Sequence, residues 1–341
     1  MFELPTVDYV TEDLSRLPDG FRLRPYAGEA DVPVIVDVIN RELEHDQVPF
    51  RVSVGDLAAR YRHSSEMFDA TRDVTIAEVD GQPVAYGERS WVDTTIETLR
   101  EYRCDGAVLP DWRRRGIGRA LLAENERRSR ELAETHVTER PRVYGSWASD
   151  RQDGTNALLR NTGFHPARWF FEMTRPLDEP IPDVPLPDGI DVRRVTPNMV
   201  RQIWDADVEA FLDHWGGFDS SDQSFQRWLD EPSFDPTLWV IAYDGDEVAG
   251  GVINGIEAEE NAALGVKRGW LHSVFTRRQW RRRGLARALI ARSLVALGDR
   301  GMDTGILGVD ADNPTGALGL YEGIGFQVAE RSTAWRKPFE L

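Results

Sequence analysis

Residues 280–289 read Trp-Arg-Arg-Arg-Gly-Leu-Ala-Arg-Ala-Leu, and residues 112–121 read Trp-Arg-Arg-Arg-Gly-Ile-Gly-Arg-Ala-Leu. The two segments lie 168 residues apart, counted from Arg113 to Arg281. In each, arginines and small residues stand between an apolar run and a stretch with helical spacing, which predicts a strand, a loop and then a helix. The recurrence indicates an internal repeat.

Further landmarks recur in the same order at nearly the same spacing. They are residues 21–26 and 190–195, the turn dipeptides Asp80-Gly81 and Asp244-Gly245, and the pairs Gly163-Phe164 and Gly325-Phe326. We therefore expect a tandem duplication with domains at residues 1–175 and 190–341. Residues 176–189, PLDEPIPDVPLPDG, are rich in proline and acidic residues, which predicts a stiff extended linker.

Each half is predicted to be an α/β (α+β) unit with a mixed, mostly antiparallel sheet flanked by helices. The alternation of apolar patterns predicts a short strand, helical stretches, a hairpin, a further strand, the Arg/Gly loop with its helix, another strand and helix, and a closing strand pair. The expected ranges are 21–26, 73–91, 101–108, 116–134 and 142–148 in the first half, and 190–195, 197–213, 238–256, 269–276, 284–298 and 304–310 in the second.

Composition narrows the class of protein. The 341 residues are 41% hydrophobic, enough for two full cores, and no apolar stretch is long enough for a membrane span. The acidic N-terminus lacks a secretory pattern, and the single cysteine, Cys104, excludes an internal disulfide, so we expect a cytoplasmic protein. A net charge of −17 argues against nucleic-acid and membrane partners, although the clustered arginines leave a nucleic-acid patch as a minor alternative.

The Arg/Gly loop has the chemistry of an anion site. A helix N-terminus presents unpaired N–H groups, small residues let an anion approach the backbone, and arginines add charged donors. Neither the Gly-x-Gly-x-x-Gly pattern of dinucleotide-binding folds nor the Gly-Lys-Ser/Thr of P-loops is present. The alternative is a plain helix start with solvated arginines, which the two matched copies disfavour.

The motifs resemble those of the GNAT superfamily of N-acetyltransferases. The second half carries Arg281-x-x-Gly284-x-Ala286, then Asn313-Pro314, and then Ala317-x-x-Leu320-Tyr321-x-x-x-Gly325-Phe326. The first half carries Arg113-x-x-Gly116-x-Gly118 and Gly163-Phe164. The tandem layout resembles the mycothiol synthase family and related two-domain actinobacterial proteins.

The resemblance implies that acetyl-CoA, as co-substrate, lies between the fourth and fifth strands with its pyrophosphate on the loop. In the second half it implies binding by Val274, Phe275, Thr276, Arg281, Arg282, Arg283, Gly284, Leu285, Ala286, Arg287 and Asn313. In the first half the matching loop is Arg113, Arg114, Arg115, Gly116, Ile117, Gly118 and Arg119. Whether the first half still binds CoA stays open.

Amide formation from a thioester benefits from a base for the amine and an acid for the leaving thiolate. By resemblance Tyr321 is the acid candidate, although a core tyrosine fits the same position. His272 is the base candidate, since alternation puts it on one face with Val274 and Thr276. Glu257 and Glu259 are the rival bases, and a structural role for His272 is the alternative.

The first half has lost these groups. The positions that match Tyr321, His272 and Asn313 are Leu159, Cys104 and Arg151. Leucine has no proton to donate, and we take Cys104 for a small buried residue. The sequence therefore predicts an active second half and a catalytically degenerate first half.

An acceptor site is expected near Asp213, His214 and Trp215, where a carboxylate, an imidazole and an aromatic ring stand beside glycines. The first half has Glu44-His45-Asp46 at the matching place, and a packed turn is the alternative.

The leading hypothesis is N-acetylation of a primary amine on a small molecule, with no nucleic-acid or membrane partner and no metal. A cysteine-glycoside amine, an aminoglycoside and another metabolite are equally open acceptors. Protein amines, or an acyl-CoA-binding sensor without turnover, are the alternatives. The fused copies favour a monomer.

Overall fold

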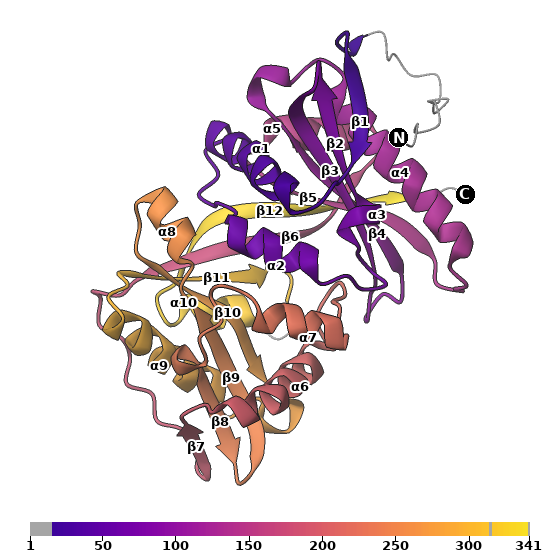
Figure 1. Cartoon of the computed structure of the whole chain (residues 1–341). Coiled ribbons are helices and arrows are strands. Elements are labelled where there is room, and N and C mark those ends of the chain that lie inside the picture. The colour runs from indigo at the N-terminus through magenta and orange to yellow at the C-terminus, as the bar shows by residue number, and fades with distance from the viewer. Residues whose placement is uncertain (1–15, 314–315, 340–341) are drawn as a thin grey trace.

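The computed structural model describes residues 16–313 and 316–339 (Figure 1). The acidic segment before residue 15 and Pro314 of the Asn313-Pro314 pair lie outside the described residues. The first half contains β1 (Phe21–Pro25), α1 (Val32–His45), α2 (Val54–Arg62), α3 (Ala70–Asp73), β2 (Val74–Val79), β3 (Gln82–Asp93), β4 (Arg100–Val108), α4 (Ile117–Thr135), β5 (Arg142–Ser149), α5 (Asp153–Asn161) and β6 (His165–Pro176).

The second half repeats this order. It contains β7 (Ile190–Arg193), α6 (Val200–Phe211), α7 (Asp222–Leu229), β8 (Val240–Asp244), β9 (Glu247–Gly255), α8 (Ala258–Leu264), β10 (Arg268–Thr276), α9 (Leu285–Asp299), β11 (Thr304–Asp310), α10 (Ala317–Glu322) and β12 (Gln327–Pro338). The predicted strands and helices are present in sequence order. The second hairpin turn sits one residue later than expected, at Gly245 and Asp246, with glycine at the position that requires a φ of +57°.

All twelve strands form one sheet in the order β1-β2-β3-β4-β5-β12-β6-β11-β10-β9-β8-β7. Only the pairs β4–β5 and β10–β11 are parallel among the described strands, so the predicted mixed, mostly antiparallel sheet is confirmed. Helices cover both faces. In the second half α9 packs with Leu271 and Leu307 on one face, and α6 packs with Ile241 and Phe275 on the other.

The closing strands are exchanged between the halves. The final strand, β12, pairs with β5 of the first half, while β6 of the first half pairs with β11 of the second. Figure 1 shows β12 running between the halves beside β5 and β6. The sequence predicted that each unit closes on its own strand pair, and that prediction is wrong, because one strand of each half makes the pair at the centre of the sheet.

The exchange carries side chains into the opposite core. Met173 on β6 is fully buried among residues of the second half, and Trp335 on β12 is 3% exposed among residues of the first. Residues 177–189 form neither helix nor strand, and Leu177, Ile181 and Leu186 of this segment pack against the second core. The two halves therefore stabilise one another through the sheet and through the connecting segment.

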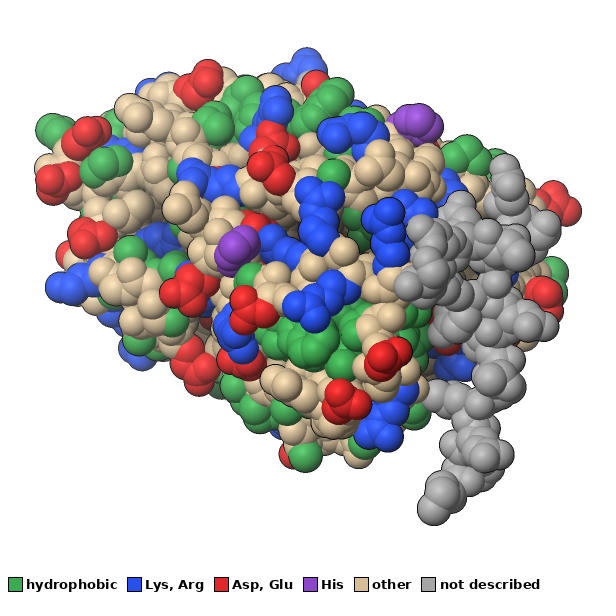
Figure 2. Space-filling model, turned by 90° about the horizontal axis from the view of Figure 1, so that it is seen from above, with side chains coloured by type: hydrophobic (Ala, Val, Ile, Leu, Met, Phe, Trp, Pro, Cys, Tyr) green, Lys and Arg blue, Asp and Glu red, His purple; other side chains and the backbone are tan. Residues whose placement is uncertain are grey.

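No helix among the described residues is long and apolar enough to cross a membrane. On the face seen in Figure 2, basic side chains gather near the middle, and acidic side chains lie interspersed around them. The net negative charge is therefore mixed with positive charge on this face.

Replacing Trp335 by alanine tests the exchange. The indole donates from Nε1 to Asn156 Oδ1 at 3.2 Å and fills the first core, so its loss should lower the free energy of unfolding by about 3–5 kcal/mol. Trp169→Ala is the matched control, because Trp169 is 39% exposed. Chemical denaturation measures both, and equal small losses would mean that β12 is not part of the first core.

Candidate active site

The two Arg/Gly loops share an unusual backbone geometry. Arg282 has a φ of +61° and Gly284 a φ of +80°, and the matching residues Arg114 and Gly116 have φ values of +62° and +83°. Gly284 caps α9, and no side chain accepts from the first N–H groups of this helix. Space around Gly284 is open, since a Cβ there would meet no atom within 4 Å. These free amides form a cradle for an anion.

The arginines of the second loop divide into two kinds. Arg281 holds the loop in place: its Nε donates to Thr276 O at 2.9 Å and its Nη1 to Asp213 Oδ2 at 2.8 Å. Hydrogen bonds from Arg278 and then Arg281 hold the pKa of Asp213 well below its usual range. Arg283 donates to Asp188 O, and Arg287 donates to Gly323 O. Arg282 has no ion pair among the described residues and lines the cleft described next.

A cleft of about 920 Å³ opens where two parallel strands separate. β10 and β11 pair only from Arg268 to Trp270 and from Thr304 to Ile306, and beyond that they diverge. We call this the splay cleft; its lining includes the predicted residues Asp213, His214, Trp215, His272, Val274, Phe275, Thr276, Arg281, Arg282, Gly284, Leu285, Ala286, Arg287, Asn313 and Tyr321. Arg283 is absent from the lining.

The diverging edge of β10 leaves hydrogen-bonding groups for a ligand. On its other edge Val274, Phe275 and Thr276 pair with β9, so their remaining backbone groups face the cleft side. Thr276 Oγ1 is buried and has no hydrogen-bond partner among the described residues. An elongated polar arm that ends in a pyrophosphate fits these features, as acyl-CoA does.

Tyr321 lies on α10 in the wall of the splay cleft. Its ring packs edge-on against Phe326 with the ring centres 6.0 Å apart, and burial raises the pKa of its hydroxyl to about 12. The hydroxyl makes no hydrogen bond with any residue of the described ranges. Tyr321 therefore presents a protonated, unengaged donor at neutral pH.

His272 sits at a bulge in β10. Leu271 pairs with Asn254 and Ser273 pairs with Ile253, so His272 is the extra residue on its strand. The expectation that His272 shares a face with Val274 and Thr276 is wrong, because the bulge breaks the alternation. Val274 packs in the core of α9, whereas the ring of His272 stacks on Trp270 with the ring centres 5.7 Å apart.

The imidazole of His272 is oriented by Glu257. Nε2 lies 2.9 Å from Glu257 Oε1, and a Cβ at Gly255 would lie 2.5 Å from Nε2, so the ring rests on a glycine. Burial raises the pKa of Glu257, but the hydrogen bond from His272, the charge of His272 and a hydrogen bond from Ser233 together outweigh it, and the net pKa is lowered. Glu257 is thus a carboxylate that accepts from Nε2 and leaves Nδ1 as the available base. Glu259, the other rival base, is exposed.

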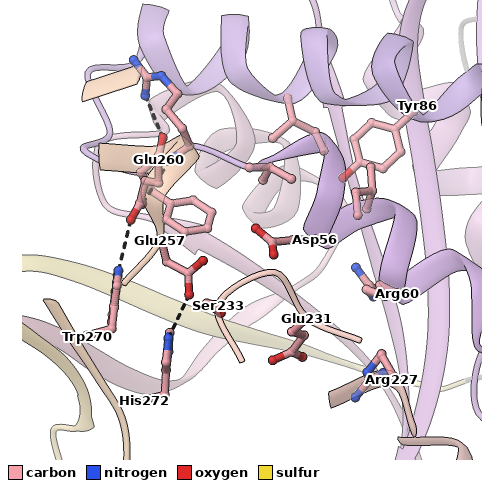
Figure 3. A pocket seen from close by; sticks show the side chains of 15 residues that line it. Asp56, Arg60, Tyr86, Arg227, Glu231, Ser233, Glu257, Glu260, Trp270 and His272 are labelled. Atoms are coloured by element: carbon pink, nitrogen blue, oxygen red, sulfur yellow. Dashed lines mark hydrogen bonds and ion pairs between the residues drawn. The ribbon is translucent and has the colours of Figure 1, made fainter. Parts of the chain in front are cut away.

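A second pocket of about 600 Å³ lies between the two halves (Figure 3). We call it the interface pocket; it is lined by Ile39, Phe50, Arg51, Val52, Asp56, Leu57, Arg60, Tyr86, Arg227, Glu231, Ser233, Glu257, Glu260, Trp270 and His272. His272 is the residue that lines both cavities, so the two adjoin at this position of β10. Sequence reasoning missed this pocket apart from His272 and Glu257.

The walls of the interface pocket come from α2 and from the segment after α7. A hydrogen bond between His63 Nε2 and Asp230 Oδ2, 2.8 Å long, joins these two walls. Gly55 also lies close to Pro232, because a Cβ on Gly55 would be 2.9 Å from the proline ring. Burial raises the pKa of Glu231 to about 7 and raises that of Asp56. The carboxyl group of Glu231 is therefore partly protonated near neutrality and can donate as well as accept hydrogen bonds.

The first half has the same loop but a smaller cavity, about 240 Å³. Arg113 is paired with Glu42 at 3.1 Å and with Asp46 at 2.7 Å, and a Cβ at Gly116 would lie 3.5 Å from Leu17. At the positions that match the acid and base, Leu159 and Cys104 are buried, and burial raises the pKa of the Cys104 thiol.

The other first-half residues also have structural contacts. Arg151 pairs with Glu330 on β12, Ile117 is 1% exposed, and Gly118 packs against Leu158. The guanidinium of Arg115 lies over the ring of Trp112.

The segment of residues 213–218 forms part of the wall of the splay cleft rather than of the interface pocket. His214 packs on Phe211, burial lowers the pKa of its imidazole, and Arg336 on β12 lies 4.3 Å over the ring of Trp215. The first half holds this segment: Thr95 N donates to Gly216 O at 3.1 Å, and a Cβ at Gly217 would lie 2.3 Å from Asp93 O. An acceptor role for Asp213, His214 and Trp215 stays a prediction.

No group of three or more His, Cys, Asp or Glu side chains among the described ranges could hold a metal ion.

Comparison with known proteins identifies the family. Residues 200–326 match the model of the acetyltransferase (GNAT) family, and residues 70–165 match that of an acetyltransferase (GNAT) domain. A mycothiol acetyltransferase of Salinispora arenicola is 34% identical over 74% of this chain and 77% of its own length. The chain belongs to the GNAT family of acetyltransferases. It is therefore an acyltransferase with two GNAT units, and proteins of this family use acyl-CoA.

Other relatives agree in both sequence and fold. The mycothiol acetyltransferase of Geodermatophilus obscurus is 31% identical over 78% of this chain and 82% of its own length. A GCN5-related N-acetyltransferase from Sphaerobacter thermophilus superposes with a TM-score of 0.70 at 26% identity, covering 95% of this chain and 98% of that one. A tandem GNAT protein from the clavulanic acid biosynthesis pathway shares the fold, with a TM-score of 0.69 at 17% identity over 94% and 99% of the chains.

Replacing Gly217 by alanine should weaken acetyl-CoA binding roughly tenfold, because the added methyl displaces the wall segment from Asp93. Gly298→Ala is the matched control, since a Cβ there meets nothing within 4 Å and its φ is ordinary. Calorimetric titration measures both dissociation constants. Unchanged affinity in the Gly217 variant would mean that the first half does not support the cleft.

Proposed function

We propose that the protein transfers an acetyl group from acetyl-CoA to the primary amine of a small molecule, and that the second half carries out the reaction. The observation that carries this proposal is the position of His272, the residue that lines both the splay cleft and the interface pocket. An acyl group in the one cavity and an amine in the other would meet beside a base.

His272 takes the proton from the attacking amine in this proposal. With Nε2–H donated to Glu257 Oε1, Nδ1 carries the lone pair that accepts it. The Glu257 carboxylate fixes this tautomer and stabilises the imidazolium that forms. The bond from the amine nitrogen to the acetyl carbon forms as the carbon–sulfur bond breaks.

Tyr321 supplies the proton to the leaving thiolate. Its hydroxyl stays protonated at neutral pH, because burial raises its pKa to about 12, and it is not engaged by another described residue. The imidazolium and the tyrosinate then return to their starting states by exchange with solvent. The acid and the base come from opposite sides of the splay, α10 and β10, so both can face one reacting carbon.

The pyrophosphate is held by the loop of the second half. The amides after Gly284 and the unpaired guanidinium of Arg282 provide the charge, while Arg281 keeps the loop rigid through Asp213. In the first half the cavity is about a quarter of the size, and buried Leu159 and Cys104 stand at the positions that match Tyr321 and His272, which supports a scaffold role.

A small-molecule acceptor is supported by the size of the interface pocket, about 600 Å³ between two halves, and by the relatives named mycothiol acetyltransferase. We therefore prefer a small amine to a protein amine.

Replacing Tyr321 by phenylalanine and His272 by alanine tests the assigned roles. Each change should lower kcat by roughly 10²–10⁴, the usual contribution of a general acid or base, with little change in the dissociation constant of acetyl-CoA. A panel of small primary amines with a thiol-release assay measures turnover, and calorimetry measures binding.

Tyr243→Phe is the matched control, because this buried tyrosine of the same half has a hydroxyl without a partner among the described residues and lies outside both cavities. Turnover should survive this change. Wild-type turnover in the Tyr321 or the His272 variant would remove that residue from the mechanism.

A further inference from the structure

Arg227 is a half-buried cation that lines the interface pocket, and it forms no direct ion pair with any described residue, although the charges of Glu231 and Asp219 act on it. It lies on α7, and its Nη2 donates to Ser224 Oγ at 2.8 Å. Within residues 16–313 and 316–339 no carboxylate lies within 4.0 Å of its guanidinium nitrogens. Burial, and then the neighbouring Arg60, lower the pKa of Arg227. A desolvated guanidinium of this kind gains most from an anion that enters the pocket.

A second guanidinium stands beside it. Figure 3 shows Arg60 and Arg227 close together at one side of the pocket, reaching in from α2 and α7. Arg60 lines the pocket, its Nη2 donates to Glu88, and its guanidinium lies over the ring of Phe68. Two cations from opposite halves of the chain therefore converge on one position, and such a pair suits a carboxylate or a phosphate.

The opposite side of the pocket presents hydrogen-bond acceptors and a carboxylate instead of guanidinium groups. His272, Glu257 and Trp270 lie there, away from Arg227 in Figure 3, with Asp56 and Glu231 between the two sides. A lone pair on His272 and the carboxylate of Glu257 suit an amine. The carboxyl groups of Asp56 and Glu231 in the middle suit a spacer with hydroxyl or other hydrogen-bonding groups.

We infer that the interface pocket takes a primary amine that also carries an anionic group, a carboxylate or a phosphate, with the amine at His272 and the anion at Arg227 and Arg60. The inference rests on the proposed function and narrows the class of acceptor from primary amines in general to amines with an anionic group. A neutral amine would leave Arg227 desolvated and unpaired, and an acceptor with a second cation would meet like charge there.

The first test compares matched amines: glucosamine with glucosamine 6-phosphate, and butylamine with 4-aminobutyrate. In the wild type we expect kcat/KM to be about tenfold or more higher for the anionic member of at least one pair, which also separates phosphate from carboxylate. Arg227→Gln should remove most of that ratio by raising KM. Arg227→Lys should keep part of it, and Arg201→Gln, an exposed arginine on α6 outside the pocket, should leave it unchanged.

A preference for the neutral members, or an unchanged ratio in Arg227→Gln, would overturn the inference while leaving the acetyltransfer proposal intact. Thermal melting of each variant establishes that it folds.

The second test does not depend on turnover. With the splay cleft saturated by CoA, equilibrium dialysis against labelled inorganic phosphate should show a site that Arg227→Gln loses and Arg201→Gln keeps. Absence of binding in the wild type, or equal binding in Arg227→Gln, would overturn the inference. Phosphate binding without acetylation of any amine would instead count against the proposed function alone.

Discussion

The parallel pairing of β10 with β11 ends after three residues, and the rest of the second half depends on this separation. Divergence exposes backbone groups that a continuous sheet would have satisfied, and so it creates both a cavity and the hydrogen-bonding capacity to fill it. The loop at the end of β10 then leads straight into α9, so the helix N-terminus stands at the mouth of the same cleft. The bulge at His272 re-aims one side chain from the splay toward the neighbouring pocket.

In the proposed arrangement, the first half of the duplicated chain is a structural support for the second half. The first half keeps the strained loop geometry, but its cavity is smaller, at about 240 Å³. It supports the second half structurally: β6 pairs with β11, Asp93 packs against Gly217, and α2 forms a wall of the interface pocket. Because the closing strands are exchanged, neither half has a complete sheet without the other. The fused arrangement is therefore part of the site and not only a tether.

The local features of this fold could be predicted from the sequence, and the long-range ones could not. The repeat, the order of the elements and the Arg/Gly loops follow from short motifs and periodicity, whereas the resemblance to the GNAT superfamily implied that Tyr321 and Thr276 share one cleft. The exchange of β6 and β12 depends on which sheet edges meet in space, and equivalent strands carry equivalent patterns in both halves. The bulge at His272 depends on the spacing of β9, so strict alternation assigned its face wrongly.

The interface pocket combines residues that are far apart in the chain. Asp56 and Arg60 come from the first half and Arg227 and Glu231 from the second, and no local signal joins them. The ion pair of Arg281 with Asp213 could have been predicted from the repeat. The first half contains a similar pair, Arg113 with Asp46, so an arginine and an aspartate recur in both copies.

Titration of acetyl-CoA into the wild type and into the loop variants Gly284→Glu and Gly116→Glu tests the assignment of the donor site most directly. A glutamate in the loop places negative charge against the pyrophosphate. We predict one strong site in the wild type, lost in Gly284→Glu and retained in Gly116→Glu. Binding that survives Gly284→Glu and disappears in Gly116→Glu would contradict the account.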